Sequence, residues 1–148
     1  MTGSPRPITT VRIGLHSLTL EQPDIIVSRA NGGFSEPEMM ALLMTVAEWV
    51  GMHGRLFWIA DISRIGPICP EARRATAGIG KRTGISGCAI FGGSFQQRLI
   101  TTLTVTAAKL LRTQELAPIT YVPTEADARL WVSDLRNRLD LELHRASA

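Results

Sequence analysis

The 148-residue chain contains few of the residues that stabilise small disulfide-bonded or metal-binding domains. Its two cysteines, Cys69 and Cys88, are far apart in the sequence and do not form a Cys-x-x-Cys motif. This spacing predicts neither a zinc site nor a disulfide framework. A domain of this length buries roughly 70% of its unfolded surface, so it needs neither for stability. We therefore expect no metal and no cofactor.

Long apolar runs and aromatic residues are scarce as well. No apolar run approaches the ~20 residues that a membrane-spanning helix requires. The first seven residues lack the apolar core of a signal peptide, so we expect a cytoplasmic protein. The chain has a single tyrosine and a net charge of only +3, which gives little support for stacking or electrostatic binding of nucleic acid.

The residues that are present indicate one globular α/β domain over residues 10–140, with tails at 1–9 and 141–148. The apolar fraction is 45% and the charged fraction is 20%, as in ordinary soluble domains. Strands and helices alternate from residue 24 onward, which predicts a mixed, mostly parallel sheet of four or five strands with an N-terminal β-hairpin and about four helices. The predicted strands cover residues 11–20, 25–29, 55–63, 88–91 and 118–122.

Helix starts are the clearest local signals. Ser35 with Glu38, and Ser94 with Gln97, each form a capping-box pattern. Thr124 with an acid three residues later predicts a further cap. The predicted helices run from 35 to 51 or 54, from 71 to 78, from 94 to 112 and from 124 to about 140. The third contains a β-branched stretch, but its cap favours a helix with Leu99 facing inward.

The stretch 55–63 is an apolar run that ends with Asp61 and Ser63, followed by a predicted loop at 64–70. A run of this kind between turn signals predicts a central strand that is buried on both faces. In open α/β sheets, functional loops follow the carboxyl ends of such strands. We therefore expect recognition to take place just beyond this strand.

The order of these segments resembles the SpoIIAA-like branch of the STAS superfamily, a fold shared with CRAL-TRIO lipid carriers. The matching segments are 59–63, where the family has an apolar run and Asp-Leu-Ser, 89–92, and 121–132. The resemblance spans about residues 10–135. It implies a βα superhelix and a binding or regulatory role without catalysis, as in the bacterial members of this group. One departure is that the serine phosphorylated in anti-sigma-factor antagonists is replaced here by Ile68-Cys69-Pro70, which leaves such a switch in doubt.

No catalytic set is visible in the sequence, so we do not predict an enzyme. The three histidines, His16, His53 and His144, have no evident nucleophile beside them. Cys88 is predicted to be an inert core residue. Cys69 lies at a helix start, where a thiolate is favoured, and is the cysteine whose reactivity is worth testing.

Two surfaces are candidates for binding. A protein partner is expected at the loop and short helix after the central strand, where the candidate residues are Asp61, Ser63, Arg64, Cys69, Arg73 and Arg74. An anion could lie at the strand-to-helix turn, where the candidates are Gly92, Gly93, Ser94, Lys81 and Arg82, although a tight turn with an N-cap is the simpler interpretation. The alternative function is a carrier or sensor of a small apolar or lipid-like ligand, and a homodimer is also left open.

Overall fold

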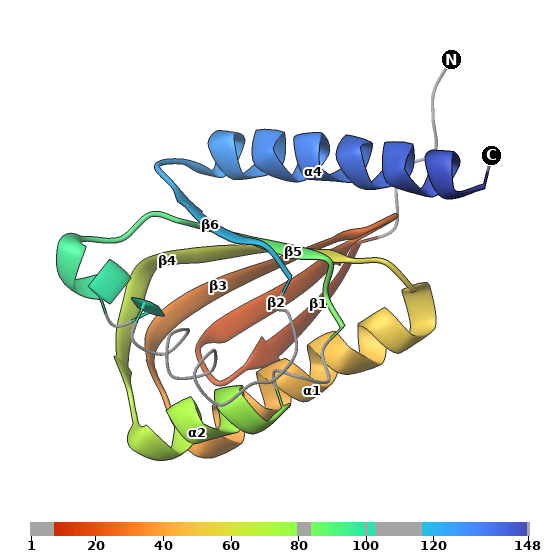
Figure 1. Cartoon of the computed structure of the whole chain (residues 1–148). Coiled ribbons are helices and arrows are strands. Elements are labelled where there is room, and N and C mark those ends of the chain that lie inside the picture. The colour runs from red at the N-terminus through yellow and green to blue at the C-terminus, as the bar shows by residue number, and fades with distance from the viewer. Residues whose placement is uncertain (1–7, 80–83, 100, 103–116, 148) are drawn as a thin grey trace.

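The computed structural model of the chain describes residues 8–79, 84–99, 101–102 and 117–147, which form a sheet with helices on both faces (Figure 1). The strands are β1 (Ile8–Ile13), β2 (His16–Glu21), β3 (Ile25–Phe34), β4 (Phe57–Ile68), β5 (Gly87–Phe91) and β6 (Ile119–Val122). The helices are α1 (Glu36–His53), α2 (Pro70–Ile79) and α4 (Glu125–Ala146), and residues 95–99 and 101–102 are also helical.

The sheet has six strands in the order β1-β2-β3-β4-β5-β6 and is mixed. β1, β2 and β3 are antiparallel neighbours, whereas β3, β4, β5 and β6 run parallel. The expectation of four or five mostly parallel strands was therefore wrong. The predicted single strand 11–20 is in fact a hairpin that turns at Gly14 and Leu15, and β1 starts inside the predicted N-terminal tail.

Gly14 explains this difference. Its φ of 59° lies in the left-handed region, which suits the first position of a two-residue hairpin turn. Apolar residues recur on both sides of the turn, at positions 11, 13, 15, 18 and 20, so the sequence pattern was interpreted as one strand.

The central strand is confirmed as the middle of the parallel part of the sheet, with β3 and β5 on its two sides. It does not end at residue 63, however. β4 continues to Ile68 through the predicted loop, and among the described strands only β3 pairs with this extension. Two register shifts interrupt this pairing, and at each one β4 contains an extra residue. Bulges of this kind bend a strand and increase its twist.

The bulges change the spacing of inward-facing residues on β4. Ile62, Ile65 and Ile68 are all buried in the same cluster, although three-residue spacing would place alternate side chains on opposite faces of a regular strand. Each bulge shifts the alternation by one residue and returns the next isoleucine to the inner face. A periodicity search for regular strands therefore does not recognise this part of β4.

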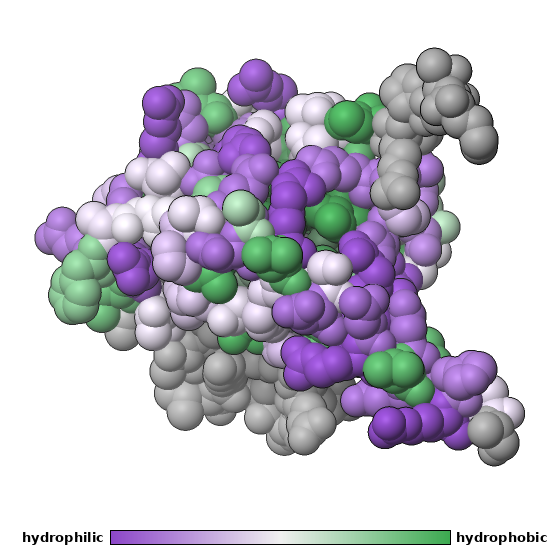
Figure 2. Space-filling view, turned by 90° about the horizontal axis from the view of Figure 1, so that it is seen from above, coloured by the Kyte–Doolittle hydropathy of each residue, from purple (hydrophilic) through white to green (hydrophobic). Residues whose placement is uncertain are grey.

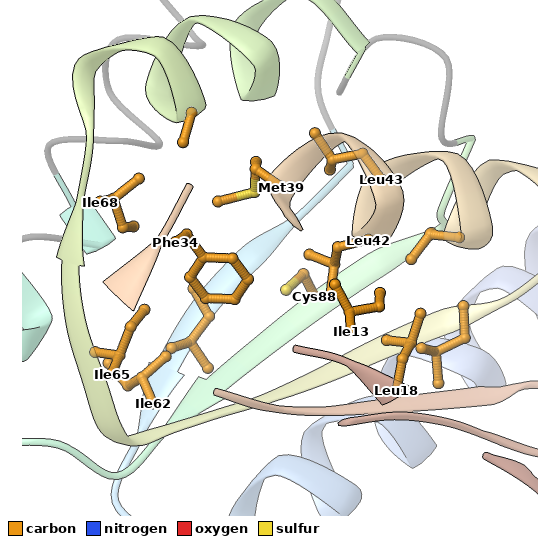
Figure 3. Packing of buried hydrophobic residues seen from close by; sticks show 14 of the residues in the cluster. Ile13, Leu18, Phe34, Met39, Leu42, Leu43, Ile62, Ile65, Ile68 and Cys88 are labelled. Atoms are coloured by element: carbon orange, nitrogen blue, oxygen red, sulfur yellow. The ribbon is translucent and has the colours of Figure 1, made fainter. Parts of the chain in front are cut away.

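Two apolar clusters lie on opposite faces of the sheet. The larger lies between the sheet and α1 with α2, and Figure 3 shows Phe34 there between the isoleucines of β4 on one side and Met39 and Leu42 of α1 on the other. The smaller lies between the sheet and α4; its buried residues are Val27, Phe57, Ile59, Ala89, Ala128, Val132 and Leu135. The molecule thus has three layers, with the sheet in the middle.

The helix caps are confirmed. Ser35 and Glu38 form a complete capping box on α1, Gly54 is its C-cap, and the Thr124 side chain accepts from the N–H of Asp127 on α4. α4 extends to Ala146, six residues beyond the predicted end of the domain. Leu99 is 46% exposed, so its predicted inward orientation was wrong. The remainder of that predicted helix, from 103 to 112, lies outside the described residues.

None of the described helices combines the length and the apolar character that crossing a membrane would require.

Candidate functional site

The predicted partner-binding residues fall into two separate groups in the structure. Asp61 and Ser63 lie beside the turn that follows β5, close to Gly92 and Gln97. We call these four residues, with Gly93 and Ser94, the strand-end cluster. Cys69, Arg73 and Arg74 lie on or just before α2, beyond the extended part of β4. The predicted loop would have kept all of these residues together, but the strand that replaces it separates them.

Asp61 is the most heavily bonded member of the strand-end cluster. Its Oδ1 accepts from the backbone N–H of Ser63 at 2.9 Å and from the Ser63 hydroxyl at 2.7 Å. Its Oδ2 accepts from Nη1 of Arg29 at 2.9 Å. Partial burial by itself would raise the pKa of Asp61, but the hydrogen bonds from Ser63 and Arg29 outweigh burial, and the pKa is lowered. Asp61 is thus an ionised carboxylate whose charge is already compensated.

Gly92 and Gly93 allow the chain to pass close to this carboxylate. Their φ values are 79° and 82°, in the region that favours glycine. A Cβ on Gly92 would lie 3.1 Å from Cβ of Ser63 and 3.4 Å from Oδ1 of Asp61. The two glycines therefore bring the start of the next helix against the middle of β4.

Gln97 joins that helix to β4. Its Oε1 accepts from the N–H of Ser94 at 2.6 Å, and its own N–H donates to the Ser94 hydroxyl at 3.3 Å, which confirms the capping box. Its Nε2 donates to the carbonyl oxygens of Ser63 and Ile65 at 3.0 and 3.3 Å. These carbonyls lie on the part of β4 that β5 does not reach, so a side-chain amide supplies hydrogen bonds where the neighbouring strand has ended.

These contacts weigh against an anion at the turn. The cap already uses the N–H groups of Ser94 and Gln97, and an anion near Gly92 would face the carboxylate of Asp61. The geometry favours the simpler interpretation of a tight turn with an N-cap. Lys81 and Arg82, the predicted cationic contributors, lie outside the described residues.

The second group lies at the start of α2. Sγ of Cys69 accepts from the N–H of Ala72 at 3.4 Å, and the Cys69 N–H donates to the carbonyl of Phe34 at 3.3 Å. The half-buried Cys69 thus acts as the N-cap of α2. Arg74 is exposed, with Nη2 3.8 Å from Oε1 of Glu71. Nε of Arg73 is buried and has no hydrogen-bond partner among the residues that the structure describes.

Cys88 is buried in the core, as the sequence predicted, whereas the three histidines have surroundings that differ from one another. Burial raises the pKa of Cys88 to about 12, so its side chain remains a protonated thiol at neutral pH. His16 is buried and stacked on Phe34, with ring centroids 3.8 Å apart. His53 and His144 are exposed at or near helix ends.

The tautomer of His16 follows from its two hydrogen bonds. Nδ1 lies 2.9 Å from the backbone N of Asn31, which can only donate, so Nδ1 is the acceptor. The proton of the neutral ring is then on Nε2, which donates to the carbonyl of Gly33 at 3.0 Å. Both nitrogens are used to join β2 to the end of β3, which is a structural role.

The chemistry available at the strand-end cluster is limited. The Ser63 hydroxyl donates to a carboxylate, as a nucleophile donates to its base, but the lowered pKa of Asp61 makes it a weak base. The pairing of Asp61 with Arg29 weakens it further as a base. Within the described parts of the chain, no three His, Cys, Asp or Glu side chains are grouped so that they could hold a metal ion.

Sequence reasoning missed a row of ion pairs around α4. Asp61, Arg29, Glu125, Arg129 and Glu21 form a continuous chain of charged contacts of 2.7 to 3.3 Å that runs from β4 across β3 and α4 to β2. Hydrogen bonding to Arg29 is the main cause of the lowered pKa of Glu125.

A separate pair lies beside this row. Both Nε and Nη2 of Arg136 donate to the buried carboxylate of Asp24, at 2.7 and 2.8 Å. The partners in these ion pairs are mostly distant in the sequence, and the separation reaches 112 residues for Arg136 and Asp24. No spacing rule could have identified them.

Sequence reasoning also missed Phe95. It is the first helical residue after the Gly92–Ser94 turn and is 80% exposed. Viewed from the α4 side, hydrophobic atoms gather at the left margin of the molecule, on the side where Figure 1 places the helical residues that follow β5 (Figure 2). The capping pattern of Ser94 and Gln97 predicted the helix but not the exposure of this ring.

Comparison with known proteins identifies the fold. A search of solved structures found an uncharacterized protein of the DUF3478 family from Shewanella loihica PV-4, described as having a SpoIIAA-like fold. The two chains are 14% identical and superpose with a TM-score of 0.56 over 88% of this chain and 98% of that chain. No protein-family model and no curated protein matched the sequence. The resemblance to SpoIIAA-like domains is thus confirmed at the level of the fold.

Proposed function

We propose that this chain, which has a SpoIIAA-like fold, is a non-enzymatic module that binds a protein partner at the strand-end cluster and the adjoining helix. The observation that carries the proposal is the exposure of Phe95 directly beside the cluster. Single exposed apolar residues are common on protein surfaces and need no explanation. Phe95, however, is accompanied by Leu99 one turn later on the same face of the helix, and both are exposed.

The charges around Phe95 suggest the kind of partner. Arg98 lies on the same side of the helix, and Arg64 lies on the neighbouring part of β4; both are exposed and form no ion pair with any described residue. Asp61 is compensated by Arg29, so the free charge of this surface is positive. Aromatic and arginine side chains are enriched among residues that dominate binding energy in protein interfaces. We therefore expect a partner segment that carries both apolar and acidic side chains.

Compared with the sequence prediction, the proposed surface keeps Asp61, Ser63 and Arg64 and adds the helix that begins at Phe95. Cys69, Arg73 and Arg74 lie beyond the extended part of β4 and are not part of it. A partner that contacted both groups would have to follow the curved end of β4.

Site-specific photo-crosslinking in the cells of origin tests the proposal. A benzophenone amino acid at position 95 is expected to give discrete crosslinked species. The matched control places the same amino acid at position 141, because Leu141 is an exposed apolar residue on α4. Arg64→Glu with Arg98→Glu should remove the crosslinks from position 95. Equal crosslinking at the two positions, or no effect of the charge reversal, would contradict the proposal.

The ligand-carrier alternative rests on fold kinship and on the many apolar residues of the predicted helix 95–111, most of which lie outside the described residues. Native mass spectrometry of the purified protein separates the two functions. A lipid-sized mass that stays bound to the protein and is unaffected by Phe95→Ser would support a carrier and count against the partner surface.

A further inference from the structure

The first strand lies at one end of the sheet and has a regular outer edge. All six residues of β1 pair with β2 without a register shift, from Ile8 opposite Glu21 to Ile13 opposite His16. Among the described residues, no strand lies on the other side of β1.

The hairpin turn fixes which backbone groups point outward. In a two-residue hairpin the closing pair, here Ile13 and His16, exchanges both backbone hydrogen bonds, and such pairs alternate along the ladder. The N–H and C=O groups of Ile8, Thr10 and Arg12 therefore point away from β2. They form a row of donors and acceptors that another strand could pair with.

This edge carries few of the features that normally prevent pairing with another chain. Exposed edges are usually shortened, bulged or interrupted by proline or by several charges. β1 has no proline, no bulge and a single charge, on Arg12. The strand at the opposite end of the sheet, β6, has only four residues. Of the two edges, β1 is the longer template.

We infer that β1 pairs antiparallel with β1 of a second copy of this chain, which joins the two sheets into one. The two-fold axis passes through Thr10, so Thr10 of one copy lies opposite Thr10 of the other. Ile8 then lies opposite Arg12 in both directions. This register brings all three outward-pointing residues of each copy into hydrogen-bonded pairs, and it forms the isologous contact that two-fold symmetry requires.

The side chains are compatible with this register. Ile8 is 67% exposed in the single chain, and the aliphatic part of Arg12 from the other copy would cover it. The two Arg12 residues are four positions apart along the paired strands, roughly 13 Å, which exceeds the Debye length of about 8 Å at physiological salt. No like charges lie directly opposite each other.

The inference is independent of the proposed partner surface. The strand-end cluster lies at β4 and β5, and β2 and β3 separate it from the β1 edge. A dimer formed through β1 leaves Phe95 accessible in each copy, so either proposal can fail without the other.

Two matched variants test the dimer. Thr10 and Thr19 lie opposite each other on β1 and β2, and their hydroxyls are 3.1 Å apart. Thr10→Lys and Thr19→Lys therefore lose the same hydrogen bond and add the same charge, but only Thr10→Lys places like charges at the two-fold axis. Light scattering after size exclusion is expected to show a dimer for the wild type and for Thr19→Lys. For Thr10→Lys, the dissociation constant should rise by roughly tenfold or more.

A monomeric wild type at its highest soluble concentration, or equal effects of the two variants, would overturn the inference. Circular dichroism melting shows whether each variant is folded. The register has its own test, because hydrogen-bonded antiparallel pairs have Cα atoms about 5.5 Å apart, within reach of a short bismaleimide crosslinker. In a Cys69→Ser background, the bismaleimide should join Thr10→Cys into a covalent dimer and should not join Thr19→Cys; the reverse result would overturn the register.

Discussion

The two faces of the sheet are covered in different ways. On the α1 face, the larger apolar cluster holds the layers together, and Figure 3 shows its side chains meeting from the sheet and from α1. On the α4 face, the apolar cluster is smaller, and ion pairs to Asp24, Asp61 and Glu21 surround it. Apolar burial is non-directional and nearly independent of pH, whereas ion pairs depend on both salt and protonation. The stability of the α4 layer is therefore expected to depend on salt and pH, and that of the α1 layer much less.

A pair of leucine truncations tests the comparison most strongly. Leu43 on α1 and Leu135 on α4 are buried to nearly the same extent, at 3% and 4% exposure. We expect Leu43→Ala to lower the free energy of unfolding by about 4 kcal/mol and Leu135→Ala by about 2–3 kcal/mol. The difference is expected because the truncation in the larger cluster should leave a larger residual cavity. Urea denaturation measures both. An equal or larger effect for Leu135→Ala would mean that α4 depends on apolar packing as much as α1 does.

Two arginines refine the comparison within the α4 face. Arg55 and Arg136 both lie over the ring of Phe57, at 5.5 and 5.6 Å from its centroid, but only Arg136 holds a buried carboxylate. Arg136→Met leaves Asp24 buried without its partner and should cost about 2 kcal/mol of unfolding free energy. Arg55→Met breaks an exposed pair with Asp140 and should cost less than about 1 kcal/mol.

Thermal and urea unfolding of Arg136→Met and Arg55→Met measures the two losses of stability. Similar losses would show that contact with the Phe57 ring, which the two arginines share, matters more than the carboxylate.

The smallest expected effect is a dependence on pH. The pKa values of Asp61 and Glu125 are lowered in the folded protein, so their ion pairs stabilise it above the unfolded pKa of about 4–4.5, and this contribution disappears as the pH falls through the lowered values. Glu125→Gln should cost less than about 1 kcal/mol at pH 7, since the pair is largely exposed. The difference from the wild type should shrink as the pH falls below about 4.

Urea unfolding across this pH range, for the wild type and Glu125→Gln, measures the effect. The matched control is Glu48→Gln on the exposed side of α1, where Glu48 has no ion-pair partner among the described residues. A Glu125→Gln difference that stays constant with pH would show that its ion pairs contribute nothing to stability.

Sequence reasoning succeeded where the signal is local. The caps at Ser35, Ser94 and Thr124 each depend on residues no more than three positions apart, and all three are present. The central position of the 55–63 stretch also followed from a local property, its uninterrupted apolar run. The fold could be identified because these local signals occur in a characteristic order along the chain.

Sequence reasoning failed where the determining contact joins residues that are distant in the sequence, or where a bulge interrupts the regular two-residue period of a strand. The extension of β4 was predicted as a loop because its bulges convert a two-residue period into a three-residue one. Arg29 and Arg129 carried no signal, because their partners approach only in the folded chain. The predicted partner surface was divided for the same reason, since a strand stands where a loop was expected between Ser63 and Cys69.

The bulges in β4 also make its length critical. A one-residue deletion between Ile62 and Ile65, or between Ile65 and Ile68, would remove the extra residue of a bulge and with it the bend that the bulge introduces into β4. Gly33 and Gly66 restrict substitution in the same region, because a Cβ at either position would overlap backbone atoms of the facing strand. Between Ile62 and Ile68, the length of β4 therefore determines the curvature of the sheet edge, and its glycines determine how closely β3 can approach.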